Sequence, residues 1–321
     1  MMVIQDTAPR TTRPGQLALL LAFAVIYVVW GSTYLAIRYA VETIPPLLAV
    51  VLRQGLAGGA IFAYAWRQGY RPSLREWRAS AVLGVLYFAI GHGTLHWAET
   101  IVPSGLAALL TASEPIWIAA MAALVSRDER VTTKTVLGLL LGVAGVALLL
   151  RADADAGPSH RHLLLGCVVI LIGTLSWSAG VIYSRNAALP RDPVARAGMA
   201  AMTGAGLLFF AALGSGEVLH AHPSMFSARS VGALLYLIVF GSIITFTTYT
   251  WLLDHCSPTL VATHTYANPI IAVILGWLFA GEALDRRLLL AGLVTLLAVF
   301  LISRGTTQPT NVDGQRLSET A

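Results

Sequence analysis

The chain has 321 residues, of which 56% are apolar and only 12% are charged. A soluble domain carries roughly 25% charged residues, so this composition excludes an ordinary soluble enzyme or binding domain. The formal net charge of +5 lies in short clusters between long apolar runs, and no basic run is interleaved with exposed aromatic residues, which argues against a nucleic-acid-binding surface. The composition therefore predicts an integral membrane protein.

Ten apolar runs follow one another along the chain. A membrane-spanning helix needs about 20 mostly apolar residues to cross roughly 30 Å of hydrocarbon. The runs are continuous and longer than the roughly ten-residue alternating strands of a membrane barrel, so they predict an all-α membrane protein with ten transmembrane helices. The predicted spans are 17–38, 47–66, 79–100, 103–125, 135–150, 163–184, 195–214, 230–253, 259–280 and 288–303.

The two ends of the chain and the segment 151–162 are polar. We interpret 1–16 and 305–321 as disordered cytoplasmic tails, and we find no cleavable signal peptide. With the N-terminus in the cytoplasm, fourteen Lys and Arg residues fall in or beside the inside segments and six outside. This asymmetry predicts that both termini are cytoplasmic.

The chain repeats itself. The segment PSGLAALLTASEP at 103–115 is echoed by PTLVATHTYANP at 258–269. Trp30 precedes Trp177 by the same number of positions that separates other matched pairs of residues in the two halves of the chain. We therefore predict two five-helix repeats, 17–150 and 163–304, joined by a periplasmic linker at 151–162. Because five is an odd number, the second repeat enters the membrane in the opposite orientation. Inverted repeats are a hallmark of secondary transporters, whose substrate sites lie near the bilayer midplane.

Several segments together also resemble a known family. They are WGSTYLAIR at 30–38, Pro45-Pro46, Arg53, PSGLAALLTASEP, Asp128-Glu129, SWSAG at 176–180 and YANPIIAVILGWLFAGE at 266–282. In this order and spacing they resemble the EamA-type members of the drug/metabolite transporter superfamily over about 17–304. The resemblance implies ten spans in two repeats, a bacterial inner membrane, and export of amino acids, related metabolites or drugs, down a gradient or against protons. It implies a substrate class and not a compound.

The first span offers two aromatic candidates. Trp30 and Tyr34 are four residues apart and share a helical face, where they serve either helix packing or the wall of a substrate cavity. Trp177 is the repeat counterpart of Trp30, which favours the cavity wall. In the second span, Arg53 is either an anchor that reaches the surface, a member of a structural ion pair, or a cation beside the substrate.

The third span places His92, His96 and Glu99 on one face. The two histidines have a spacing at which they could share a metal ion, but the sequence offers no HExxH motif and no second ligand cluster, so we predict no metal and no cofactor. The histidines are then either buried and hydrogen-bonded, or lining the pathway, where imidazole would permit proton coupling.

Two prolines mark the remaining candidates. Glu114 precedes Pro115 in the fourth span, and Asn268 precedes Pro269 in the ninth. Proline removes a helical hydrogen bond and frees carbonyl groups. An acid at this depth must be protonated or paired, and it could exchange a proton for a cationic substrate, cap a carbonyl, or pair with Arg53. Asn268 could orient the polar end of a substrate.

We predict a secondary transporter, located in the inner membrane, that exports a small amphipathic or aromatic solute by alternating access. Its predicted partners are the small-molecule substrate and membrane lipid, with protons as a candidate coupling ion and no nucleic acid; the sequence leaves the oligomeric state open. A passive facilitator or channel shares most of these features. An intramembrane metal-dependent enzyme would need a nucleophile with a base or a zinc ligand set, and we find neither, so we predict that the protein is not an enzyme. The predicted pathway residues are Trp30, Tyr34, His92, His96, Glu114, Trp177, Tyr249, Tyr266 and Asn268.

Overall fold

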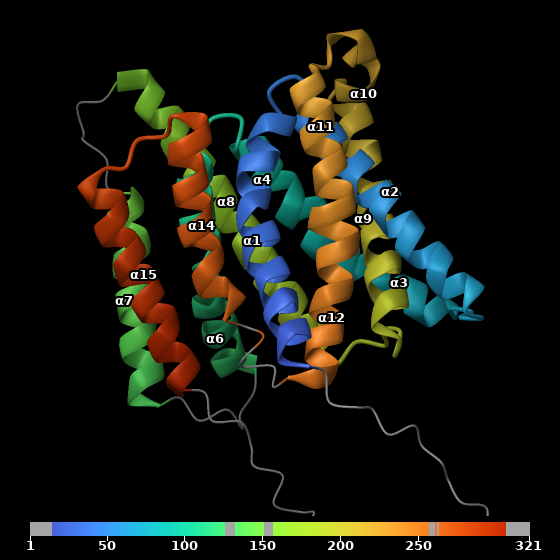
Figure 1. The fold of residues 1–321 in the computed structure, drawn as a ribbon, viewed down its shortest axis with the longest axis horizontal. Helices are drawn as coiled ribbons and strands as arrows, with labels where there is room; N and C mark the ends of the chain where they lie inside the picture. Colours follow the sequence, from blue (N-terminus) through green and yellow to red (C-terminus); the bar gives the residue numbers. More distant parts are fainter. Residues whose placement is uncertain (1–14, 126–131, 151–156, 257–260, 262, 306–321) are drawn as a thin grey trace, which may run out of the picture.

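The structure is a computed structural model that describes residues 15–125, 132–150, 157–256, 261 and 263–305. Every regular element in these ranges is a helix, and most of the helices run along one common direction (Figure 1). In the first half of the chain the helices are α1 (Gln16–Ala40), α2 (Pro46–Arg67), α3 (Leu74–Gly84), η1 (Val85–His92), α4 (Gly93–Ala98), α5 (Ser104–Thr111), α6 (Glu114–Val125) and α7 (Thr133–Leu150). In the second half they are α8 (Gly157–Ser184), α9 (Pro193–Gly214), α10 (Glu217–His220), η2 (Pro223–Met225), α11 (Ala228–Tyr236), η3 (Leu237–Ile244), α12 (Thr245–His255), α14 (His264–Ala280) and α15 (Arg286–Gly305).

The helices are long and apolar enough for a membrane protein. Among the described residues, seven helical stretches meet the length and hydropathy expected of a membrane span, and two further apolar helices, Thr133–Leu148 and His264–Ala280, are shorter. The predicted all-helical membrane class is thereby confirmed, whereas the count of ten spans stays a prediction. Helix α8 begins at Gly157, so it includes residues that the sequence assigned to the linker.

Two of the long stretches contain a π-helical segment. The stretch α3, η1 and α4 carries one at Val85–His92, and the stretch α11, η3 and α12 carries the other at Leu237–Ile244. A π-helix is wider than an α-helix and shifts the angular position of the residues beyond it, and such segments are frequent at functional sites. Neither segment is signalled by the local sequence pattern.

The prolines predicted to disturb helices act differently in the two halves. The fourth predicted span is interrupted at 112–113, between α5 and α6, immediately before Glu114 and Pro115. Proline lacks an amide proton and its ring clashes with the preceding turn, which explains this break. Helix α14 instead continues through Pro269.

Helix pairs from the two halves pack against each other. Helix α2 packs along α9, and α7 packs along α15 at the opposite edge of the bundle (Figure 1). Glycine allows the first pair to approach closely: a Cβ atom on Gly58 would lie 2.7 Å from the Cβ of Ala201. Between these edges, α1 contacts α14, α11 and α12, while α8 contacts η1, α4 and α6.

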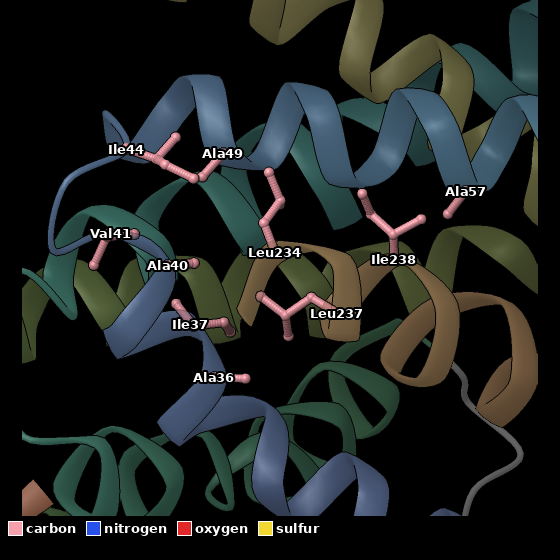
Figure 2. Close-up of a cluster of buried hydrophobic side chains, with 10 residues drawn as sticks. All are labelled: Ala36, Ile37, Ala40, Val41, Ile44, Ala49, Ala57, Leu234, Leu237 and Ile238. Carbon is pink, nitrogen blue, oxygen red and sulfur yellow. The ribbon is translucent and has the colours of Figure 1, made fainter. Parts of the chain in front are cut away.

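A buried apolar cluster joins the first two helices to the stretch α11–η3 (Figure 2). Leu234, Leu237 and Ile238 from that stretch meet side chains of α1 and α2, and Ile37 and Leu237 are at most 2% exposed. Close van der Waals packing of these side chains holds α11–η3 beside α1. The cluster consists of Ala36, Ile37, Ala40, Val41, Ile44, Ala49, Ala57, Leu234, Leu237 and Ile238.

Candidate functional site

One aromatic group forms where α1 meets α12 and α14. The Trp30 ring lies 4.9 Å from the His264 ring and 5.2 Å from the Tyr249 ring, measured between centroids, and the latter two rings are 5.8 Å apart. The Trp30 indole N–H donates to the carbonyl oxygen of Gly241 in η3 at 3.1 Å. This bond fixes the indole in place. We refer to Trp30, Tyr249 and His264 as the first aromatic group.

A second aromatic group forms where η1 meets α8. The Trp177 ring stacks on the Tyr87 ring, with 4.3 Å between centroids and 24° between planes, and on the His92 ring, with 5.5 Å and 9°. The Gln54 amide nitrogen lies 2.8 Å from Nδ1 of His92. If that amide donates, Nδ1 accepts and the proton of a neutral imidazole sits on Nε2. We refer to Tyr87, His92 and Trp177 as the second aromatic group.

The Glu114 carboxyl interacts with side chains of both groups. It is close enough to interact electrostatically with the hydroxyls of Tyr87 and Tyr249, one from each group, and the Trp177 side chain lies beside it. Glu114 is partly buried and sits at the first position of α6, directly after the helix break. Its backbone carbonyl accepts a 3.4 Å hydrogen bond from the Ser178 hydroxyl of α8. An acid flanked by aromatic rings suits a solute that has a cationic or polar end and a flat apolar body.

Asn268 supports the first aromatic group. In the amide orientation that satisfies its neighbours, its nitrogen donates to the carbonyl oxygens of Tyr27, at 3.2 Å, and His264, at 3.1 Å. The Tyr27 hydroxyl in turn lies 2.5 Å from the Thr263 hydroxyl. These bonds tie α14 to α1 and use amide protons of Asn268 that could otherwise be donated to the polar end of a substrate.

Two predicted pathway tyrosines lie elsewhere. The Tyr34 hydroxyl is 2.7 Å from the Thr111 hydroxyl at the end of α5, and the ring packs against a buried apolar cluster. The Tyr266 hydroxyl donates to the carbonyl oxygen of Val299 in α15 at 3.2 Å, and its ring packs with that helix. Tyr34 therefore lies beside the end of α5, the helix that precedes Glu114. Tyr266 instead faces α15 and is a member of neither aromatic group.

His96 and Arg53 are buried near His92. His96 is fully buried, and its Nδ1 lies 2.9 Å from the carbonyl oxygen of His92. Arg53 is 4% exposed, and its Nε donates to the Ser242 hydroxyl of η3 at 3.2 Å. The structure thus excludes the surface-anchor interpretation of Arg53. Within the described residues, no three His, Cys, Asp or Glu side chains gather as a metal site.

The sequence analysis missed Tyr87 and Gln54. Tyr87 lies in an ordinary apolar run, and only the packing of η1 on α8 brings it onto Trp177. Gln54 adjoins Arg53, and a second polar side chain inside a predicted span was the available signal.

Comparison with known proteins identifies the family to which this architecture belongs. Residues 16–151 and 164–304 each match the model of the EamA-like transporter family. The chain belongs to this family. The EamA-like chain is 35% identical over 289 residues to the inner membrane transporter YedA of Escherichia coli (strain K12), with 88% of this chain and 90% of YedA covered. It is 26% identical over 280 residues to a chloroplastic WAT1-related protein of Arabidopsis thaliana, covering 85% and 66%.

More distant matches agree. The EamA-like chain is 23% identical over 285 residues to the transporter YoaV of Bacillus subtilis (strain 168), covering 88% and 95%. A protein of known crystal structure aligns with a TM-score of 0.60 at 21% identity, covering 89% of this chain and 97% of the other, and so has the same fold. The resemblance drawn from the sequence motifs is confirmed. The family and these relatives indicate a membrane transporter rather than an enzyme.

Proposed function

We propose that the chain is a secondary transporter of the bacterial inner membrane that exports a small amphipathic or aromatic solute by alternating access. The observation that carries this proposal is the Glu114 carboxyl, which interacts electrostatically with Tyr87 of one aromatic group and Tyr249 of the other. Each group is built from both halves of the chain: Trp30 meets helices of the second half, and Trp177 meets a helix of the first. A site of this kind changes its access when the halves move relative to each other.

The arrangement of helices supports ten spans in two inverted five-helix repeats, and the excess of Lys and Arg in the inside segments supports cytoplasmic termini. The π-helical segments η1 and η3 occupy corresponding positions in the third and eighth predicted spans. The two most extensively packed helix pairs, α2 with α9 and α7 with α15, join the second span to the seventh and the fifth to the tenth. Such exchange-related pairs are expected of two repeats that share one pseudo-two-fold axis.

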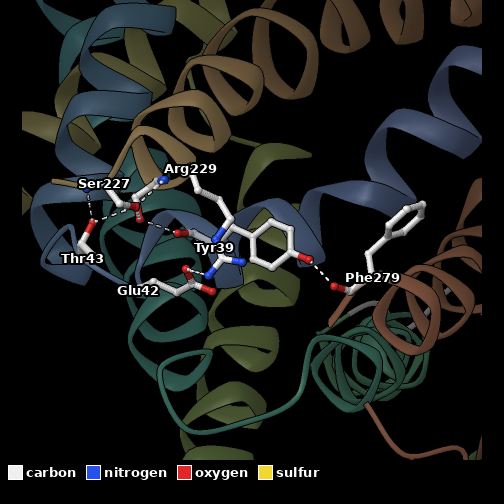
Figure 3. Close-up of polar contacts among 7 residues, drawn as sticks. Tyr39, Glu42, Thr43, Ser227, Arg229 and Phe279 are labelled. Carbon is white, nitrogen blue, oxygen red and sulfur yellow. Dashed lines mark hydrogen bonds and ion pairs between the residues drawn. The ribbon is translucent and has the colours of Figure 1, made fainter. Parts of the chain in front are cut away.

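Polar contacts link helices at one end of the bundle (Figure 3), and we propose that they close this end. At this closed end α1 and α14 end, while α5 and α11 begin. The Tyr39 hydroxyl donates to the carbonyl oxygen of Phe279 at 2.7 Å, and the Arg229 guanidinium donates to the Glu42 carboxylate at 2.5 Å. If the termini are cytoplasmic, the closed end faces the periplasm, and the structure represents a state that is shut on that side.

In this state we assign Glu114 the role of binding the cationic end of the solute. Without a solute the carboxyl takes a proton, because an unpaired charge at this depth is costly. The aromatic groups hold the apolar part of the solute by stacking. Exchange of a proton for a solute at one carboxyl would couple export to the proton gradient.

The test is solute efflux from proteoliposomes that contain the purified protein. A panel of amino acids, aromatic metabolites and cationic drugs is measured with and without an imposed pH gradient, for the wild type, Glu114→Gln and Glu76→Gln. Glu76 closes a capping box at the start of α3, where glutamine is an accepted substitute, so it is the matched control. We expect gradient-driven transport that is lost in Glu114→Gln and kept in Glu76→Gln.

Two other outcomes have definite meanings. Transport that ignores the gradient and survives Glu114→Gln would identify a passive facilitator and would remove Glu114 from the mechanism. No transport of any compound by correctly folded protein would contradict the proposed exporter.

A further inference from the structure

This inference rests on the proposed transport cycle and concerns the closed end. There Glu282, which follows α14, caps the N-terminus of α5. One carboxylate oxygen accepts from the Ser104 amide at 2.7 Å and the Ser104 hydroxyl at 2.8 Å, and the other accepts from the Gly105 amide at 2.9 Å. The first amides of a helix have no partner within the helix, and a negative charge is favoured there. Since all three partners donate, Glu282 binds them as a carboxylate.

Arg38 of α1 completes this contact. Its Nε lies 3.6 Å from the Glu282 carboxylate, and Nη1 donates to the backbone carbonyls of Val102, at 3.2 Å, and Glu99, at 3.4 Å. Arg38 therefore holds the backbone of the α4–α5 connection and the charge of Glu282. It makes no hydrogen bond with the side chain of Glu99.

Glu99 is left without a partner. It is 1% exposed, and neither of its carboxyl oxygens has a hydrogen-bond partner among the described residues. An ionised carboxylate that is buried without a hydrogen bond is strongly disfavoured, whereas the neutral acid is tolerated far better. Because Glu99 lies just beyond the end of α4, any widening of the closed end would bring it into contact with water.

The charges around Glu99 come from three other elements. Arg38 of α1 and Arg53 of α2 favour the ionised form, whereas the Glu282 carboxylate opposes it. Tyr34 of α1 is a titratable neighbour of Glu99, and His96 precedes Glu99 by three positions on the same stretch. Burial without a hydrogen bond favours the neutral acid most strongly, and the Glu282 carboxylate acts in the same direction.

We propose that Glu99 is a proton-binding site whose protonation is coupled to closure of this end. When Glu282 caps α5, Glu99 is enclosed as the neutral acid. When the end opens, Glu282 leaves the α5 N-terminus, water reaches Glu99, and its O–H bond breaks to give a carboxylate and a hydrated proton on that side. Closure reverses this step and takes up one proton from the same side.

The sign of the pH dependence follows from this balance. The closed state binds one more proton than the open state, so closure is favoured as pH falls. The ratio of closed to open protein changes by up to about tenfold per pH unit between the pKa values of the two states. Above the higher value and below the lower value the ratio becomes constant.

The experiment measures the closed end directly and needs no substrate. The variant carries His162→Cys, near the start of α8, and Leu284→Cys, in the segment between α14 and α15, and Cys167 and Cys256 are replaced. Spin labels are attached to the two new cysteines, because both positions are exposed. Distance distributions are recorded in liposomes from mildly acidic to mildly alkaline pH. In the wild type we expect a short distance at low pH and a growing longer component as pH rises.

The variants separate Glu99 from other acids. Glu99→Gln cannot ionise, so its distribution should stay short at every pH, and Glu99→Asp should keep the pH response. The matched control is Glu217→Gln at the same end, where the carboxylate accepts from the amides of Leu47 and Leu48 and an amide oxygen can replace it. This control should follow the wild type.

Either of two results overturns the inference: a wild-type distribution that does not change with pH, or a pH response that persists in Glu99→Gln. If Glu99→Gln fails to fold, the wild type and Glu99→Asp still decide, because a missing response in both contradicts the proposal. Failure of the transport assay leaves this measurement untouched, so the two proposals fail separately.

Discussion

The contact between α3 and α9 gives a sharp test of the packing, because two glycine backbones touch there. A Cβ atom on Gly84 would lie 2.6 Å from both the carbonyl oxygen of Ala200 and the amide nitrogen of Gly204, and 2.5 Å from the Thr203 hydroxyl. The first two are backbone atoms, which cannot rotate away as a side chain can. We therefore expect Gly84→Ala to push α3 and α9 apart.

The magnitude follows from three effects. Overpacking of a close interface costs about 1–3 kcal/mol. The displaced Thr203 hydroxyl, which donates to the Ser80 carbonyl at 3.0 Å, loses a bond worth about 1 kcal/mol. The higher helix propensity of alanine returns about 1 kcal/mol. The free energy of unfolding of Gly84→Ala should therefore fall by about 1–3 kcal/mol.

The assay is SDS-induced unfolding in mixed micelles, followed by helical circular dichroism. The control is Gly59→Ala in α2, where an added Cβ meets nothing within 4 Å. This control should unfold at the same SDS fraction as the wild type or a higher one. If the two variants agree within about 0.5 kcal/mol, the range of an ordinary surface substitution, the close approach of α3 to α9 is refuted.

Two further predictions concern the site and the closed end. Trp177→Leu removes the ring that stacks on Tyr87. The loss of an aromatic contact of about 1 kcal/mol, together with lost buried area, should raise the KM for an aromatic solute about tenfold. The control Trp277→Leu, at a position that is 51% exposed on α14, should leave KM unchanged, and equal effects of the two variants would contradict the proposed site. Tyr39→Phe removes the hydrogen bond to the Phe279 carbonyl, which is worth about 0.5–1.5 kcal/mol. The ratio of closed to open protein in the spin-label measurement should therefore fall about two- to tenfold. An unchanged ratio would show that this bond does not stabilise the closed end.

The sequence predicted the class and part of the site for clear physical reasons. Long apolar runs leave a chain in lipid no alternative to helices, and this part of the prediction is confirmed. The internal repeat paired Trp30 with Trp177, and the structure puts one of them in each aromatic group. Glu114 stood out because an acid is rare at that depth.

The other features of the site depend on contacts between segments that are distant in the sequence, so the local pattern did not predict them. Tyr87 meets Trp177 through η1, and nothing in the local pattern at 85–92 indicates a π-helix. The cost of a charge in lipid left Arg53 as an anchor, a member of an ion pair or a cation beside the substrate, because its hydrogen-bond partner Ser242 lies 189 positions later. Tyr266 shows the same limit, since periodicity could not decide that it faces α15.

The Glu282 cap also bears on how the protein is made. Glu282 follows Ser104 by 178 positions, and the residue at the N-cap of α5 is Pro103, which makes no side-chain cap of its own. At a synthesis rate of about 5–20 residues per second, the amides at the start of α5 wait roughly ten to forty seconds for their carboxylate. The first repeat therefore enters the membrane with one helix end unfinished, and this end is completed by the segment between α14 and α15, which leaves the ribosome much later.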